Sequence, residues 1–290
     1  MIVTGVDGSM AARAAVQWAA GDAMRMHVPL LIVHVTGTVP YQAGRSGAAF
    51  PRRTRSRDGR RALREAEALV RERQPTIEVT TKEVTGEPAT ALLEQADDGV
   101  ELVLGSYACH ASFGAVPSPV NMHVAELVRC PIVLVRAEHR TVYGEVVVGV
   151  DGSPACGPAL TYAFLQAELR EATLRVVHAW QTPAHAVTAG NTRGMSEVTA
   201  ERLLARDLVK AVGHDHPRVP VVEDLLRADP VTALTAAAGQ ADLLVVGWDR
   251  ATAPEPLGQV SRGVLRRARC PVAVVHSWAM PEERGDRRRR

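Results

Sequence analysis

The pentapeptide GVDGS occurs twice in this chain, at Gly5–Ser9 and at Gly149–Ser153. Two later segments recur in the same order, as the pairs ELVLGS (101–106) with DLLVVGW (242–248) and RCPIVLVR (129–136) with RCPVAVVH (269–276). The spacing between the copies changes only from 144 residues at the first motif to 140 at the last. Self-similarity at a nearly fixed offset indicates a tandem duplication, so the sequence predicts two similar units of about 140 residues.

Each unit alternates short apolar runs with longer stretches of helical periodicity. We expect the units at 1–137 and 145–278, followed by a basic tail at 279–290. Buried strands separated by helices predict a parallel sheet covered on both faces, and right-handed crossovers make it doubly wound. The predicted fold class is therefore α/β, with two doubly wound units in tandem and each ligand site where the strand order switches. The helices predicted in the first unit are Met10–Met26, Arg60–Gln74, Pro88–Asp97 and Val120–Arg129.

Composition supports a folded protein and excludes several classes of function. With 290 residues and 46% hydrophobic side chains, the chain can bury a substantial core. The formal net charge of +2 is too small to indicate nucleic acid binding, and the basic clusters at 52–61 and 287–290 are predicted to be solvated loops or tails. We recognise no membrane span, signal segment or C-x-x-C pair, so we expect a reduced, cytoplasmic protein without a membrane partner.

The GVDGS motif admits two roles. The glycine and serine are suited to turning the chain and capping the next helix through the serine oxygen, and Pro154 fits the first helical position of the second unit. This capping role does not require the preceding aspartate. A carboxylate at the carboxyl end of a parallel strand can accept hydrogen bonds from a ribose or an adenine amine, so Asp7 and Asp151 are predicted ligand contacts.

Other repeated residues favour structural roles. His34 and His178 end the second strand of each unit, and a hydrogen bond to a neighbouring strand end is favoured over catalysis because no nucleophile or metal pattern accompanies them. Cys130 and Cys270 each precede a proline and an apolar run, which favours small buried hydrophobes over redox centres. The variable segments 36–59 and 181–196 are predicted surface loops, with a lid over a nucleotide as the alternative.

After the fourth strand of each unit, a glycine-containing segment leads towards a helix, as phosphate-binding loops do. With GVDGS, the two histidines, Gly86-x-Pro88 and the CP-aliphatic ends, these segments resemble the universal stress protein family over nearly all of both units. The resemblance implies Rossmann-like units of the adenine nucleotide α-hydrolase-like fold, which bind ATP or not according to a loop of pattern G-x2-G-x9-G-[ST]. It also implies pairing through the last strands, here within the chain, with a homodimer as a further assembly.

Both loops depart from that pattern. In the first unit Gly105 matches, but Ala108 stands at the second glycine, and Ser118-Pro119 stand where Gly-Ser/Thr is expected. Serine does not readily adopt positive φ and proline lacks an N–H donor, so this phosphate cradle is predicted to be lost. In the second unit Gly247 and Gly258 match. Arg250 replaces the middle glycine there, where its side chain either fills the phosphate space or contacts phosphate through the guanidinium. The loop is also two residues shorter, and Gln259 replaces the Ser/Thr. The second unit is therefore predicted to be the better nucleotide site.

Taken together, the sequence predicts an ATP-binding regulatory module of the stress response. Mg²⁺ can accompany ATP, but the sequence supplies no dedicated metal-ligand set. The absence of H-x-G-H, S-G-G-x-D-S and G-x-x-x-x-G-K-[ST] motifs argues against an enzyme, while leaving weak ATP hydrolysis open. The alternative is a degenerate scaffold that no longer binds ATP and acts through protein contacts. The resemblance implies nucleotide contacts at Asp151, Ala179 (backbone), Gly247, Arg250, Gly258 and Ser261, and at Asp7 and Gly105 if the first unit binds a nucleotide at all.

Overall fold

In the computed structural model of this chain, two compact units are distinguished by their internal contacts. Unit 1 comprises Met1–Thr141 with Leu265–Val272, and unit 2 comprises Val142–Val264 with the chain from Ala273 onward. The structure describes residues 1–37, 52–106, 118–137, 141–153, 155–180, 192–248 and 257–277.

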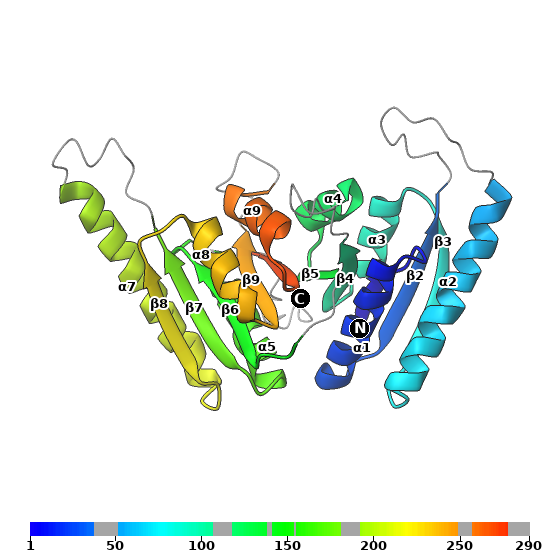
Figure 1. Cartoon of the computed structure of the whole chain (residues 1–290), viewed down its shortest axis with the longest axis horizontal. Coiled ribbons are helices and arrows are strands. Elements are labelled where there is room, and N and C mark those ends of the chain that lie inside the picture. The colour runs from blue at the N-terminus through cyan, green and yellow to red at the C-terminus, as the bar shows by residue number, and fades with distance from the viewer. Residues whose placement is uncertain are drawn as a thin grey trace, which may run out of the picture. The chain divides into compact units, whose positions relative to one another are not determined.

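Unit 1 contains five parallel strands in the order β3-β2-β1-β4-β5 (Figure 1). The order reverses between β1 and β4, which makes the sheet doubly wound, as the sequence predicts. Its elements along the chain are β1 (Ile2–Gly5), α1 (Met10–Met26), β2 (Leu30–Thr36), α2 (Arg52–Arg73), β3 (Val79–Thr85), α3 (Pro88–Ala96), β4 (Glu101–Ser106), α4 (Pro119–Leu127) and β5 (Ile132–Arg136).

The helices of unit 1 divide between the two faces of this sheet. Helices α1 and α2 pack together against one face, and α3 and α4 pack together on the other. Two glycines at strand ends show which helix covers each face. A Cβ added at Gly5 would contact Leu92 of α3, and one added at Gly105 would contact Ala11 of α1. A parallel sheet covered on both faces needs apolar side chains on both, which accounts for the continuous aliphatic runs in the sequence.

Unit 2 repeats this arrangement, with the strand order β10-β9-β6-β7-β8 and parallel pairing of β6 with β7 and β9, and of β7 with β8. Helices α5 and α7 pack together, and α8 lies against β6 and β7. Its elements are β6 (Glu145–Val150), α5 (Cys156–Leu169), β7 (Thr173–Ala179), α7 (Thr192–Asp215), β8 (Val221–Leu226), α8 (Pro230–Ala237), the 3₁₀ turn η1 (Ala238–Gln240), β9 (Leu243–Trp248), α9 (Gln259–Arg267) and β10 (Val272–His276).

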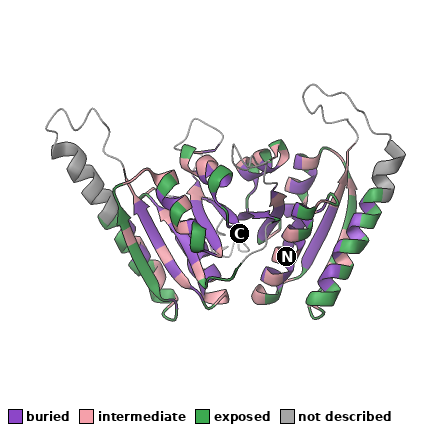
Figure 2. Ribbon diagram, viewed as in Figure 1, coloured by how far each residue is buried: buried purple, intermediate pink, exposed green. Residues whose placement is uncertain are grey.

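The core of each unit is built from aliphatic side chains, because aromatic residues make up only 4% of the chain. Figure 2 shows buried residues concentrated on the inner strands, whereas the outer strand β8 is largely exposed. Cys130 and Cys270 are buried, which confirms their predicted place in the core. Among the described helices, none combines the length and the apolar character that a membrane crossing requires.

The second helix of unit 1 begins earlier than the sequence predicts. The prediction started it at Arg60 and assigned the preceding basic cluster to a loop, but α2 begins at Arg52. Arginine has high helix propensity, so the arginine-rich segment can extend the amphipathic helix that follows it by further turns. Ion pairs one turn apart, Arg61 with Glu65 and Arg71 with Glu67, lie on the exposed side of this helix.

The two GVDGS turns share a backbone conformation but start their helices differently. Gly8 and Gly152 have φ of 83° and 76°, values that favour glycine. Ser9 caps α1 as predicted, since its Oγ accepts a hydrogen bond from Ala12 N. The same prediction for Ser153 is wrong, because α5 begins at Cys156 and its N-cap residue makes no side-chain hydrogen bond.

The glycine at the end of β4 lets the first turn of α1 approach the strand backbone. A Cβ at Gly105 would lie 2.5 Å from Ala11 O, and one at Gly247 of β9 would lie 2.7 Å from Ala155 O. These contacts are too short for any side chain. Both glycines therefore have a packing role that is independent of any ligand.

We predict that Gly105→Ala destabilises the protein by roughly 1–3 kcal/mol, the usual cost of overpacking a tight contact. The measurement is the urea midpoint, read from circular dichroism. The matched control is Gly157→Ala in α5, where an added Cβ meets nothing within 4 Å. We expect that variant to be neutral or more stable by up to about 1 kcal/mol, as for an exposed helix position. Equal midpoints for Gly105→Ala and the wild type would contradict the packing role.

Candidate functional site

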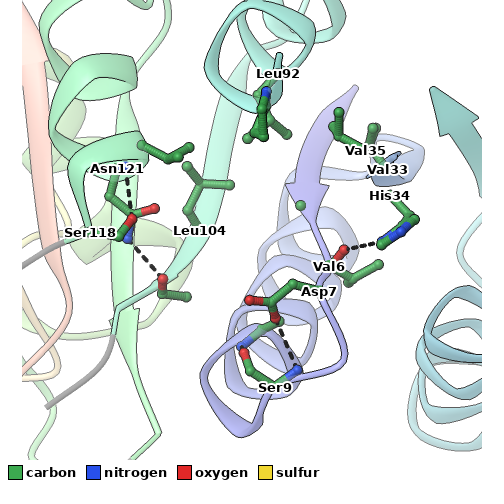
Figure 3. A pocket seen from close by; sticks show the side chains of 15 residues that line it. Val6, Asp7, Ser9, Val33, His34, Val35, Leu92, Leu104, Ser118 and Asn121 are labelled. Carbon is green, nitrogen blue, oxygen red and sulfur yellow. Dashed lines mark hydrogen bonds between the residues drawn. The ribbon is translucent and has the colours of Figure 1, made fainter. Parts of the chain in front are cut away.

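A cavity of about 310 Å³ lies in unit 1 at the carboxyl ends of β1 and β4, where the strand order switches (Figure 3). Its walls are formed by the turn after β1, the end of β2, the N-terminal part of α3, and the end of β4 with the N-terminus of α4. Its volume is within the range of small-molecule sites. Its described lining is Gly5, Val6, Asp7, Ser9, Ala12, Val33, His34, Val35, Pro88, Leu92, Leu104, Gly105, Ser118, Val120 and Asn121.

The lining corresponds closely to the site that the sequence predicted in the other unit. Asp7 and Gly105, the two predicted unit 1 contacts, lie on this one cavity. With the offsets of the repeat, Val35, Ser118 and Asn121 are the counterparts of Ala179, Gly258 and Ser261. Five of the six contacts predicted in unit 2 have a counterpart in unit 1 that the structure describes. All five of these counterparts line the same cavity. Val35, Ser118 and Asn121 were missed in unit 1, although aligning the two repeats could have found them.

The aspartate of GVDGS has a structural role that the sequence did not reveal. Asp7 Oδ1 accepts a hydrogen bond from Ser9 N at 2.9 Å, and Asp151 Oδ1 accepts one from Ser153 N at the same distance. These bonds hold the glycine turn in place in both units. A ligand role for the carboxylate is therefore an addition to this local role.

The two strand-ending histidines bond to a neighbouring strand, which confirms the predicted structural contact. His34 Nδ1 lies 2.8 Å from Val6 O, and His178 Nδ1 lies 3.0 Å from Val150 O. A carbonyl only accepts, so Nδ1 carries the proton and donates in both cases. In unit 1 the other side of the ring packs directly against Gly59 of α2.

The N-terminus of α4 forms the wall of the cavity opposite Asp7 (Figure 3). Ser118 caps this helix with φ of −60°, and its Oγ accepts from Asn121 N at 3.1 Å. The buried Asn121 side chain donates from Nδ2 to Gly105 O at 2.9 Å and so ties the helix to β4. Because Ser118 has an ordinary negative φ, the expected conflict between serine and positive φ does not arise in this structure. Ala108 lies outside the described residues.

In unit 2 the motif aspartate, Asp151, forms hydrogen bonds with a cysteine. Cys156 Sγ donates to Asp151 Oδ1 at 3.1 Å and accepts from Asp151 N at 3.2 Å. Burial raises the pKa of the Asp151 carboxyl, but the hydrogen bonds from Ser153 and Cys156 outweigh it, and the pKa is lowered overall. Burial, followed by the nearby Asp151 charge, raises the pKa of the Cys156 thiol to about 11.

The other predicted unit 2 residues lie near one another at the end of β9. Ser261 donates from Oγ to Gly247 O at 3.3 Å, and Gly258 lies beside the Trp248 ring. Ala179 ends β7, and Arg250 lies outside the described residues. The structure describes a cavity of about 250 Å³ in this unit, but it is lined by residues of β6, β7, β8 and α7, including His178, and by none of these predicted contacts.

The described part of the chain contains no group of three or more His, Cys, Asp or Glu side chains that could hold a metal ion. Nor does the described lining of the unit 1 cavity place a nucleophile beside a general base, as Asp7, Ser9 and His34 are each engaged in the local hydrogen bonds above. The arrangement suits binding through a carboxylate, backbone groups and an apolar wall.

Fold and cavity together define a tandem α/β protein with a cavity at the strand-order switch. The universal stress protein family model matches residues 1–136 and 143–276. The chain belongs to the universal stress protein family, with two units of the family in tandem.

Similar proteins share the tandem length or the length of one unit. "Universal stress protein Rv2005c" of Mycobacterium tuberculosis is 28% identical, over 94% of this chain and 96% of that protein. A solved universal stress protein from Archaeoglobus fulgidus matches with a TM-score of 0.66 and 16% identity, over 95% of each chain. A universal stress protein solved in complex with cAMP is 29% identical, with a TM-score of 0.36, over 47% of this chain and 99% of that one.

We predict that Cys130 and Cys156 react slowly with iodoacetamide at pH 8 in the native protein. Burial raises the pKa of Cys130 to about 12, and the pKa of Cys156 is raised to about 11. The reactive thiolate is therefore scarcer by about a hundredfold or more than for an ordinary thiol. Peptide mapping by mass spectrometry gives the rate for each cysteine, and the urea-unfolded protein is the control. Equal native and unfolded rates would be inconsistent with these raised pKa values.

Proposed function

We propose that this chain binds an adenine nucleotide, ATP, in the unit 1 cavity and acts as a cytoplasmic regulatory module of the stress response. The observation that carries this proposal is the convergence of Asp7, Val35, Gly105, Ser118 and Asn121 on one cavity at the strand-order switch. Family membership supports the nucleotide, since the motif residues that match the family lie on that cavity.

Each part of the cavity fits one part of a nucleotide. The Asp7 carboxylate can accept hydrogen bonds from ribose hydroxyls, and the backbone at the end of β2 can contact the edge of an adenine ring. Val33, Leu92 and Leu104 supply an apolar surface for the base. The N-terminus of α4 is directed towards the cavity, and its partial positive charge favours a phosphate there.

The geometry favours unit 1, whereas the glycine pattern favours unit 2. Nucleotide contacts at Asp151, Gly247, Arg250 and Ser261 stay predictions, as do pairing of the two units through their last strands and a homodimer. Mg²⁺ would enter with ATP. We expect binding without turnover, so ATP incubated with the protein should be recovered intact.

We predict that Asp7→Ala weakens Mg-ATP binding by about tenfold to a hundredfold, the usual range for a hydrogen bond to a charged group. Isothermal titration calorimetry measures the dissociation constant. Asp151→Ala is the matched control, because it removes the equivalent bond to the serine amide in unit 2. That variant should bind as the wild type does. Melting curves of both variants check that the turn still folds.

A second experiment separates nucleotide binding from the scaffold alternative. The purified protein is denatured and the supernatant is examined for released adenine nucleotide, and the emptied protein is then titrated with Mg-ATP. No released nucleotide and no heat at millimolar ATP would favour the degenerate scaffold. Equal weakening by Asp7→Ala and Asp151→Ala would remove the assignment to unit 1.

A further inference from the structure

The two units differ in the residue that lies five positions after the motif aspartate. Cys156 in unit 2 corresponds to Ala12 in unit 1 at the same offset of 144 residues that relates the two aspartates. Ala12 lines the unit 1 cavity together with Asp7. Cys156 is buried, and its thiol is bonded to both the backbone and the carboxylate of Asp151.

The thiol engages the atoms that a ligand would need. Asp151 Oδ1 already accepts from Ser153 N, and the Cys156 thiol adds a second donor to that oxygen at 3.1 Å. Ser153 Oγ also lies 3.9 Å from Cys156 Sγ, so the turn closes around the sulfur. The Ser153 amide and the thiol together occupy Oδ1, so ribose hydroxyls that bond to both carboxylate oxygens must displace the thiol hydrogen bond.

The start of the helix differs in the same region. In unit 1, Ser9 caps α1 through Ala12 N, and the helix begins directly after the motif. In unit 2, Cys156 N bonds to Ser153 O, and α5 starts only at Cys156. The sulfur therefore sits at the first turn of the helix, between its N-terminus and the carboxylate, where unit 1 has only the methyl group of Ala12.

We propose that Cys156 closes the nucleotide site of unit 2 and that Ala12 keeps the site of unit 1 open, so that the chain binds one nucleotide rather than two. This inference rests on the proposed function, because it concerns which of the two aspartates receives the nucleotide. Under this proposal, the residue five positions after each motif aspartate decides, together with the glycine loops, whether a unit binds a nucleotide.

The test counts Mg-ATP sites by isothermal titration calorimetry in the full chain. Wild type should bind one nucleotide. Cys156→Ala should bind two, the second with an affinity within about tenfold of the first, since it reproduces the alanine of unit 1. Cys156→Ser is the matched control: its hydroxyl still donates to Asp151, so it should bind one. The double variant Asp7→Ala/Cys156→Ala should retain the unit 2 site.

The reverse substitution tests the same idea in unit 1. Ala12→Cys should weaken Mg-ATP binding there by about fivefold or more, as one additional hydrogen bond to the carboxylate has to be displaced. Urea midpoints of every variant confirm folding. Unchanged affinity in a folded Ala12→Cys variant would overturn the proposed effect of the thiol.

The outcomes separate this inference from the proposed function. One nucleotide in wild type and one in Cys156→Ala overturns the inference and leaves unit 1 binding intact. Two nucleotides in wild type overturn it as well, because unit 2 is then already open. If wild type binds none, the proposed function is lost, and Cys156→Ala decides the inference alone: one nucleotide supports it and none overturns it.

Discussion

The approach of a helix N-terminus to a glycine at a strand end is the contact on which the unit 1 cavity and the GVDGS turn of each unit depend. At Gly105 the first turn of α1 lies so close that no side chain fits, and the same holds for Gly247 and the turn before α5. This contact fixes where the GVDGS turn lies relative to the fourth strand. Because the aspartate precedes that turn, the contact also fixes the carboxylate at the carboxyl edge of the sheet.

Around that fixed point, several residues form hydrogen bonds that stabilise the fold and also line the cavity. Asp7 holds the glycine turn through Ser9 N, and Asn121 ties α4 to Gly105 O. His34 joins the end of β2 to Val6 O. A cavity built from residues that already stabilise the turn and the helix end is largely preformed, which lowers the ordering cost of binding a ligand.

Duplication gave the chain two such turns, and they have diverged through small changes rather than through loss of the fold. In unit 2 the aspartate keeps its bond to Ser153 N but gains a thiol partner at Cys156. The helix start shifts, and Ser153 no longer caps it. The two copies of the motif therefore share the bond from the aspartate to the serine amide but differ in the side chains that follow the motif and in where the helix begins.

The sequence by itself determined the repeat, the doubly wound topology, the chain turn at the glycines of GVDGS and the helix that starts at Pro88, because these depend on local patterns and on chain order. It misplaced the start of α2, since the buried apolar side chains of this helix, such as Ala62, Ala66 and Leu69, lie after Arg60, and the segment 52–59 before it has no apolar pattern to indicate a helix. Only the tertiary structure decided that Asp7, Val35, Gly105 and Asn121 share one cavity and that Cys156 bonds to Asp151. The physical reason is that these arrangements depend on side-chain packing between strand ends far apart in the chain, and on a helix start that the motif alone does not fix.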